Sequence, residues 1–73
     1  MMTDEIIIYA KSGNISSELL KRHFDRGGIR YKEIDVSKSP KAKAEMLRLS
    51  DGQDVVPVVV IDGNVTVGLD AGR

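Results

Sequence analysis

The chain has 73 residues, and its 11 Lys and Arg side chains balance its 11 Asp and Glu, so we expect one small domain without net charge. A zero net charge argues against a general nucleic-acid binder, which needs a surplus of basic residues. The chain has no cysteine, which excludes disulfides, thiolate metal sites, iron–sulfur ligation and thiol catalysis by its own side chains. We therefore predict no metal site and no nucleic-acid partner.

The hydrophobic pattern contains no membrane segment. The longer apolar run, residues 55–61, is far short of the ~20 residues that a span requires. The N-terminus is acidic, where a secretory signal would be basic. We predict a cytoplasmic protein without a membrane partner.

Charge is distributed unevenly along the chain. Residues 11–48 carry ten basic against five acidic side chains, and both ends are acidic. Basic residues on two solvated helices explain this pattern better than an anion-binding face, which stays the alternative.

The first expected element is a strand over residues 5–10, whose continuous β-branched run is typical of a strand buried on both faces. After a turn, apolar residues at helical spacing predict a helix over residues 15–26, with Asn14 as its N-cap. The glycines at 27–28 end it, because glycine accepts the left-handed conformation there. The residues that recur at helical spacing are Ile15, Leu19, Leu20, His23 and Phe24.

Residues 29–36 are expected to form a second strand with a bend or bulge, because its apolar residues fall out of alternation. A second helix follows, with Ser39 as N-cap and Pro40 at the first helical position, where its missing N–H costs nothing. Residues 50–52, Ser-Asp-Gly, stop this helix. Its expected buried face comprises Ala42, Met46 and Leu49.

Residues 55–61 and 65–67 are expected to pair as an antiparallel hairpin around Asp-Gly-Asn at 62–64. Pro57 conflicts with this strand, because proline cannot donate to a sheet ladder. Either a cis Val56-Pro57 bond lies just before the strand proper, or a trans Pro57 lies on an edge strand. The position of the proline alone favours the edge strand.

Several segments, in this order, resemble the glutaredoxin family of the thioredoxin-fold superfamily. They are residues 9–17, the family's strand, turn and Cys-x-x-Cys or Cys-x-x-Ser helix start; 31–36, its second strand; Val56-Pro57, its cis-proline loop; 61–63, its hairpin; and 67–70, its Gly-Gly-x-Asp. The resemblance implies one domain over residues 1–73, an α/β thioredoxin-like three-layer sandwich of order βαβαββ with a four-stranded mixed sheet.

The chain departs from the family at three places. Val67 replaces a glycine, and the family's final helix is expected to be missing or truncated, because few residues follow Gly68. The sheet face beside the first helix would then be partly uncovered, and a homodimer through that face would cover it. Above all, Asn14 stands at the nucleophile position and Ser17 at the resolving position.

Neither residue can run the family's thiol chemistry. The carboxamide of Asn14 does not ionise, and the sequence supplies no base to activate Ser17. His23 lies two turns further on and is expected to be a surface or half-buried helix residue. Lys11 and the helix N-terminus, which would lower a thiol pKa at position 14, remain.

The resemblance also implies a glutathione groove, with glutathione as co-substrate and no resident cofactor. Lys11 would pair with a glutathione carboxylate, and the backbone of Val56, before Pro57, would pair with the cysteinyl unit as an added strand. The γ-glutamyl end would meet Gly68, Leu69 and Asp70. Exposed ion pairs are worth only about 0–1 kcal/mol, so weak binding is expected; as an alternative, Lys11 and Asp70 are ordinary surface charges.

Three functions stay open. The first is a glutaredoxin-like thiol-disulfide oxidoreductase, linked to the glutathione or thioredoxin system in electron transport and redox homeostasis, with a native cysteine or selenocysteine replaced at position 14. The second is a redox-silent module that binds glutathione or an extended peptide of a protein substrate. The third is an oligomerising domain. The chain as it stands is predicted to be catalytically inactive.

Overall fold

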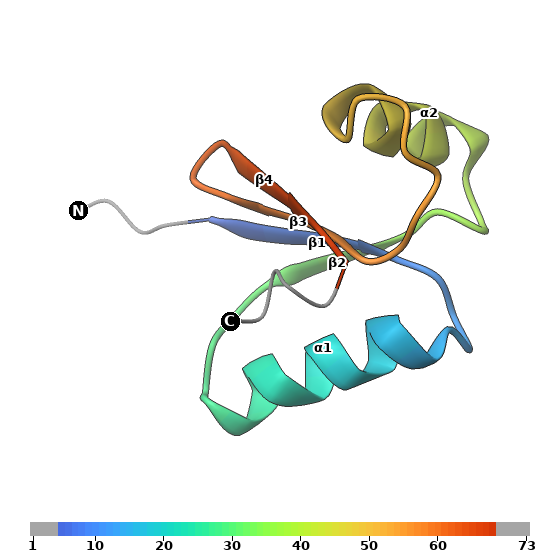
Figure 1. Cartoon of the computed structure of the whole chain (residues 1–73). Coiled ribbons are helices and arrows are strands. Elements are labelled where there is room, and N and C mark those ends of the chain that lie inside the picture. Colours follow the sequence, from blue (N-terminus) through green and yellow to red (C-terminus); the bar gives the residue numbers. More distant parts are fainter. Residues whose placement is uncertain (1–4, 69–73) are drawn as a thin grey trace.

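The computed structural model describes residues 5–68, which form two helices and four strands. In chain order these elements are β1 (Ile6–Ala10), α1 (Ile15–Arg26), β2 (Lys32–Asp35), α2 (Pro40–Leu49), β3 (Val58–Ile61) and β4 (Asn64–Val67). Figure 1 shows α1 on one face of the sheet and α2 on the other. The predicted three-layer α/β fold of order βαβαββ is therefore confirmed, whereas the expected loss of a final helix concerns residues outside the described range.

The sheet is mixed and has the order β2-β1-β3-β4. β1 pairs in parallel with β2 and antiparallel with β3, and β3 pairs antiparallel with β4. The two central strands contain no charged residue and are apolar throughout apart from the Tyr9 hydroxyl, as expected for strands that are covered on both faces. No helix within residues 5–68 is long and apolar enough to cross a membrane.

The core has two parts, one on each face of the sheet, because successive strand residues point to opposite faces. On the α1 side, Leu20 and Phe24 pack against Ile8, Ala10 and Val59. On the α2 side lies a second cluster of Tyr9, Val36, Met46 and Val58. Each helix therefore has its own hydrophobic contact with the central strands.

Both helices begin at the predicted caps. The side-chain oxygen of Asn14 accepts a hydrogen bond from the Ser17 N–H at 2.8 Å, and the Ser39 hydroxyl accepts one from the Ala42 N–H at 3.2 Å. Pro40 occupies the first position of α2. Each cap satisfies a backbone donor that the helix itself leaves free.

The second strand begins at Lys32 rather than at residue 29, and the expected bulge is absent from it. The reason is the end of α1. The Ile29 N–H donates to the Phe24 carbonyl at 2.9 Å and the Gly28 N–H to the Asp25 carbonyl at 3.1 Å, while Gly28 has a φ of 69°. These contacts form a Schellman motif, so Ile29 completes the helix instead of starting the strand.

The inward face of α1 includes only some of the residues that recur at helical spacing. Leu20 and Phe24 are buried, but Ile15 and Leu19 are 76% and 47% exposed. Ser17, which is fully buried, takes the inward place one turn before Leu20. The inward stripe therefore runs through positions 17, 20 and 24, a helical spacing; His23 is exposed, as expected.

The proline conflict is resolved by a cis Val56-Pro57 bond. Because Pro57 precedes β3, which is a central strand, the alternative of a trans proline on an edge strand is wrong, and the cis proline that the resemblance implied is confirmed. The hairpin loop is also one residue shorter than expected, since Asn64 already pairs with Ile61. Asp62 and Gly63 both have positive φ, 50° and 86°, the requirement of a two-residue type I′ turn.

Candidate functional site

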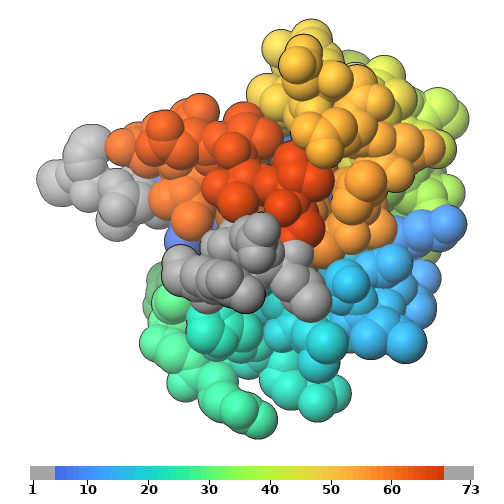
Figure 2. All heavy atoms as spheres, in the orientation of Figure 1, coloured from blue at the N-terminus to red at the C-terminus, as the bar shows by residue number. Residues whose placement is uncertain are grey.

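A hollow of about 440 Å³ lies where the start of α1 meets the loops before α2 and β3. Three predicted site residues, Lys11, Asn14 and Val56, line it together. Figure 2 shows the first part of α1, in blue, beside the orange segment that precedes β3. Residues far apart in the sequence therefore meet at one groove, which we call the α1 groove.

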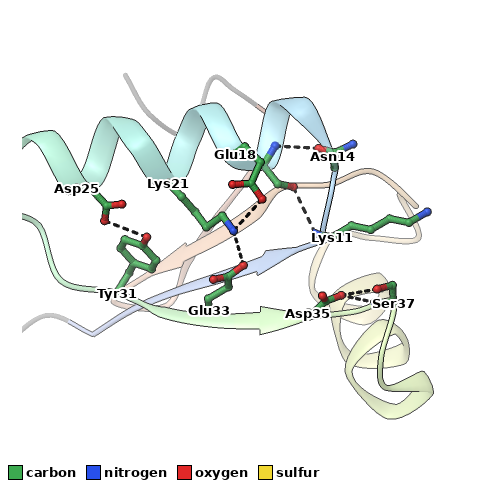
Figure 3. Close-up of polar contacts among 10 residues, drawn as sticks. Lys11, Asn14, Glu18, Lys21, Asp25, Tyr31, Glu33, Asp35 and Ser37 are labelled. Carbon is green, nitrogen blue, oxygen red and sulfur yellow. Dashed lines mark hydrogen bonds and ion pairs between the residues drawn. The ribbon is translucent and has the colours of Figure 1, made fainter.

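Asn14 lies at the mouth of this groove and also caps α1. Its side-chain oxygen accepts from the Ser17 N–H at 2.8 Å (Figure 3), and its backbone N–H donates to the Lys11 carbonyl at 3.0 Å. The cap shows that an acceptor atom on the side chain at position 14 reaches the Ser17 N–H in the first turn of α1. A thiolate at this position would meet the same donors and the positive end of the helix dipole.

Ser17 has a structural place. Its side chain is fully buried, and its hydroxyl oxygen accepts a hydrogen bond from the Lys11 N–H at 3.4 Å. This contact attaches the turn after β1 to the first turn of α1. A hydroxyl in this position cannot reach a bound substrate, so the geometry gives no support to nucleophilic chemistry by Ser17.

Charged groups surround the α1 groove. Lys11 is exposed on the loop after β1 and extends away from α1 (Figure 3). Lys43 and Asp54, which also line the groove, form an ion pair at 3.2 Å. Sequence reasoning missed this pair, because nothing in the sequence indicates that the outer face of α2 meets the loop before β3.

Asp35 is a further residue that the sequence analysis did not select. Its carboxylate accepts hydrogen bonds from the Ser37 hydroxyl at 2.6 Å and the Ser37 N–H at 2.9 Å. These bonds, together with nearby Lys38 and the Ser12 N–H, lower the pKa of Asp35. The Asp-x-Ser spacing is a signal for such a turn, and here it holds the loop beside the groove.

A second polar cluster connects α1 to β2 outside the groove. Lys21 contacts Glu33 at 2.6 Å and Glu18 at 3.1 Å, and the Tyr31 hydroxyl donates to Asp25 at 3.0 Å (Figure 3). The hydrogen bond to Glu33 is the main cause that raises the pKa of Lys21. The Lys21 ammonium is thus engaged by two carboxylates and has a structural role.

Among residues 5–68 there is no group of three or more His, Cys, Asp or Glu placed to hold a metal ion.

The remaining predicted site residues lie near the cis proline. Pro57 is buried behind Val56, and its carbonyl accepts from the Gly68 N–H at 2.8 Å. Gly68 has a φ of 80°, a conformation that favours glycine. The structure thus brings Gly68 to Pro57, while Leu69 and Asp70 lie outside the described residues.

The sheet order, the helix that starts after β1 and the cis proline before β3 together define a thioredoxin-fold protein. Within that class, the family model for Glutaredoxin matches residues 6–66. The chain therefore belongs to the glutaredoxin family, but it has no cysteine for the thiol chemistry of that family. No match is found among curated proteins.

Solved structures of related proteins have the same fold. The thioredoxin-like protein BC3987 is 29% identical, with a TM-score of 0.81, and the match covers 89% of this chain and 88% of that one. The glutaredoxin-like protein NrdH-redoxin from Escherichia coli is 29% identical over 89% and 83% of the two chains, with a TM-score of 0.77. Buckwheat glutaredoxin, in complex with glutathione, is 27% identical over 93% and 64%, with a TM-score of 0.79.

Proposed function

We propose that this chain is a redox-silent glutaredoxin-family module that binds glutathione, or a similarly extended peptide, in the α1 groove. The observation that carries the proposal is that the residue at position 14 both caps α1 and lines the groove. Asn14 caps α1 with its only side-chain oxygen, at 2.8 Å from the Ser17 nitrogen, and still lines an open groove of about 440 Å³. An open groove and a helix donor thus lie at position 14, without a group that attacks a disulfide.

The charges around the groove suit a ligand with carboxylates. Lys11 is exposed and lines the groove together with Asn14, where the N-terminus of α1 also favours negative charge. In the proposed complex Lys11 pairs with a ligand carboxylate, and the first N–H groups of α1 add to the local positive potential.

The loop before β3 offers a second mode of recognition. Val56 lines the groove two residues before β3 begins, next to the cis bond to Pro57. Its backbone can accept an extended segment as a short added strand. The proposal assigns the γ-glutamyl end of glutathione to Gly68, Leu69 and Asp70, with Asp70 facing the ligand ammonium. The complex of buckwheat glutaredoxin with glutathione supports this ligand class.

A peptide of a protein partner is the second candidate ligand. Val55, which lines the groove, is 46% exposed, and Ile15, which follows the groove residue Asn14 in the chain, is 76% exposed. Exposed aliphatic side chains beside a groove favour a peptide with apolar side chains of its own. The thioredoxin-like activity profile named for NrdH-redoxin from Escherichia coli is consistent with a protein ligand.

The test is an NMR titration of amide-labelled chain with S-methylglutathione, which has no thiol to oxidise. We expect saturable shifts at Lys11, Asn14 and Val56, with a dissociation constant on the order of 1 mM, because the ion pairs are exposed. Lys11→Glu should weaken binding by about tenfold, since the charge that meets the carboxylate is reversed.

Lys41→Glu is the matched control, because Lys41 is equally a surface lysine but does not line the groove. The control should bind like the unaltered chain. Linear, unsaturated shifts that spread over the whole surface would contradict the proposal. Equal losses in both variants would show a general charge effect instead.

A further inference from the structure

The two outer edges of the sheet differ in charge. β2 carries Lys32, Glu33 and Asp35, whereas β4, with the sequence Asn-Val-Thr-Val, has no charged side chain. Charged residues on edge strands are a common means of preventing edge-to-edge pairing between molecules. Within residues 5–68, the β2 edge therefore carries charges that oppose such pairing and the β4 edge carries none; Figure 1 labels both strands.

The backbone direction of β4 follows from its contacts with β3. The Gly68 N–H donates to the Pro57 carbonyl at 2.8 Å, and hydrogen-bonded pairs alternate along an antiparallel ladder. In this register Asn64 and Thr66 exchange hydrogen bonds with β3. The N–H and C=O groups of Val65 and Val67 therefore point to the outer edge, beyond which the described part of the chain has no strand.

We propose that this edge pairs with the same edge of a second copy of the chain. Two β4 strands related by a twofold axis perpendicular to the sheet are antiparallel. An odd-numbered residue then lies opposite an odd-numbered one and an even-numbered residue opposite an even-numbered one, so opposed side chains share a face of the sheet. With Thr66 opposite its own symmetry mate, each Val65 lies opposite a Val67. All outward N–H and C=O groups of the two valines are then paired across the axis.

The side chains suit this register. Val65 is 37% exposed, and Val65 and Val67 share the α2 face of the sheet with Val60 and Val58 by register. Pairing therefore continues the row of valines into the second molecule, while the two Thr66 side chains meet on the other face. Aliphatic pairs and threonine pairs at opposed positions both stabilise a sheet.

A second copy of β4 fits this edge better than the other edge of the sheet would. Pairing with β2 would place Glu33, which already contacts Lys21 at 2.6 Å, beside an uncharged strand. Pairing of β4 with β2 would also leave one free β2 edge and one free β4 edge, so further molecules could add without limit. Pairing of β4 with β4 uses the same edge of both molecules and therefore stops at a dimer. Each strand has only four residues, so the interface is small and the dimer should be weak and concentration-dependent.

The experiment is sedimentation equilibrium over about 10 µM to 1 mM, the range for a small interface, combined with amide hydrogen exchange. We expect a monomer–dimer equilibrium, with exchange at Val65 and Val67 slowing as the concentration rises. Thr66, whose N–H already pairs with β3, should not change. Thr66→Lys should weaken the dimer by about tenfold or more, because two like charges meet directly across the axis.

Leu19→Lys is the matched control, since Leu19 is an exposed aliphatic residue on α1 and is not part of β4. This variant should dimerise like the unaltered chain. A monomer at every concentration would overturn the proposal, and so would a dimer that Leu19→Lys disrupts and Thr66→Lys does not. Slow exchange at Val65 and Val67 in a monomer, independent of concentration, would show that another segment of the same chain covers the edge. The β4 strand does not include Lys11, Asn14 or Val56, so a failure here leaves the groove proposal intact.

Discussion

Among single residues, Asn14 and Asp35 hold the backbone beside the groove in place through side-chain hydrogen bonds. Asn14 gives a helix donor its partner, and Asp35 accepts two hydrogen bonds from Ser37. The cap could be predicted from the sequence, because asparagine before an apolar helical pattern is a standard N-cap signal. The sequence alone could not show that Asp35 lies near the groove. Its proximity to Ser12 depends on the parallel pairing of β1 with β2, which are far apart in the sequence.

The cap at position 14 can be tested by truncation. Asn14→Ala removes the oxygen that accepts from the Ser17 N–H, and should lower the free energy of unfolding by about 1 kcal/mol. Asn14→Ser keeps an acceptor at the same place and should retain most of the stability. Urea denaturation at neutral pH measures both, and equal stability of all three chains would contradict the assignment of this contact.

The lowered pKa of Asp35 predicts a pH dependence of stability. A folded-state pKa below the unfolded value means that the carboxylate stabilises the fold above about pH 4, and that this contribution is lost as the pH falls through the folded-state pKa. Asp35→Asn should therefore be less stable than the unaltered chain at neutral pH, and the difference should shrink on acidification.

Thermal melts from neutral pH to about pH 2.5, below the ordinary range for Asp, check this prediction. Ser37→Ala removes the hydroxyl that donates to Asp35 at 2.6 Å. This variant should also be less stable than the unaltered chain at neutral pH, and the difference should also shrink on acidification. A stability difference between Asp35→Asn and the unaltered chain that stays constant over the whole pH range would show that the hydrogen bonds to Ser37 do not favour the charged carboxylate.

At the scale of elements, local signals fix where the helices begin and end better than which side chains they bury. Caps and the hairpin turn are determined by residues close in sequence, as Ser39 and Gly63 illustrate. The start of β2 was misplaced because Ile29 has a β-branched side chain, yet its N–H completes the end of α1. The buried face of α1 could not be predicted, because its inward stripe uses Ser17 in place of Ile15 or Leu19.

The hairpin turn gives a prediction with an internal control. Gly63 has a φ of 86°, whereas Gly27 has a φ of −83°. Gly63→Ala should destabilise the chain by about 1 kcal/mol or more, because a side chain strains this conformation. At Gly27 an added Cβ would meet Ile29 Cδ1 at 3.5 Å, an ordinary contact, so Gly27→Ala should be neutral or slightly stabilising. Equal losses in the two variants, measured by chemical denaturation, would contradict this account of the turn.

At the scale of the whole molecule, two small clusters hold two helices on one sheet. The order of elements and the cis proline could be predicted from the glutaredoxin resemblance, and the structure and the family match confirm both. The meeting of Lys43 and Asp54 at the groove could not, because it depends on how α2 lies against the loop before β3. Of the residues that line the groove, the sequence analysis named Lys11, Asn14 and Val56 and missed Lys43 and Asp54.

The cluster under α2 predicts a large effect at its centre. Met46 is fully buried between α2 and the sheet, so Met46→Ala should cost about 2–5 kcal/mol through lost contacts and a cavity. Met46→Leu nearly conserves volume and should cost less than about 1.5 kcal/mol. Leu19→Ala, on the exposed flank of α1, should change stability by no more than about 0.5 kcal/mol. A Met46→Ala variant as stable as Leu19→Ala in urea would contradict this description of the core.

Position 14 lacks a sulfur, while a helix N–H donor and Lys11 remain around it. The most direct test compares the unaltered chain with Asn14→Cys in a glutathione-coupled disulfide-reduction assay, together with the thiol pKa of the variant. The account predicts no turnover by the unaltered chain, measurable turnover by Asn14→Cys, and a thiol pKa below the ordinary value of about 8.5, because the N–H groups of α1 and Lys11 favour the thiolate. Turnover by the unaltered chain, or a well-folded Asn14→Cys variant that is inert and has an ordinary thiol pKa, would contradict it.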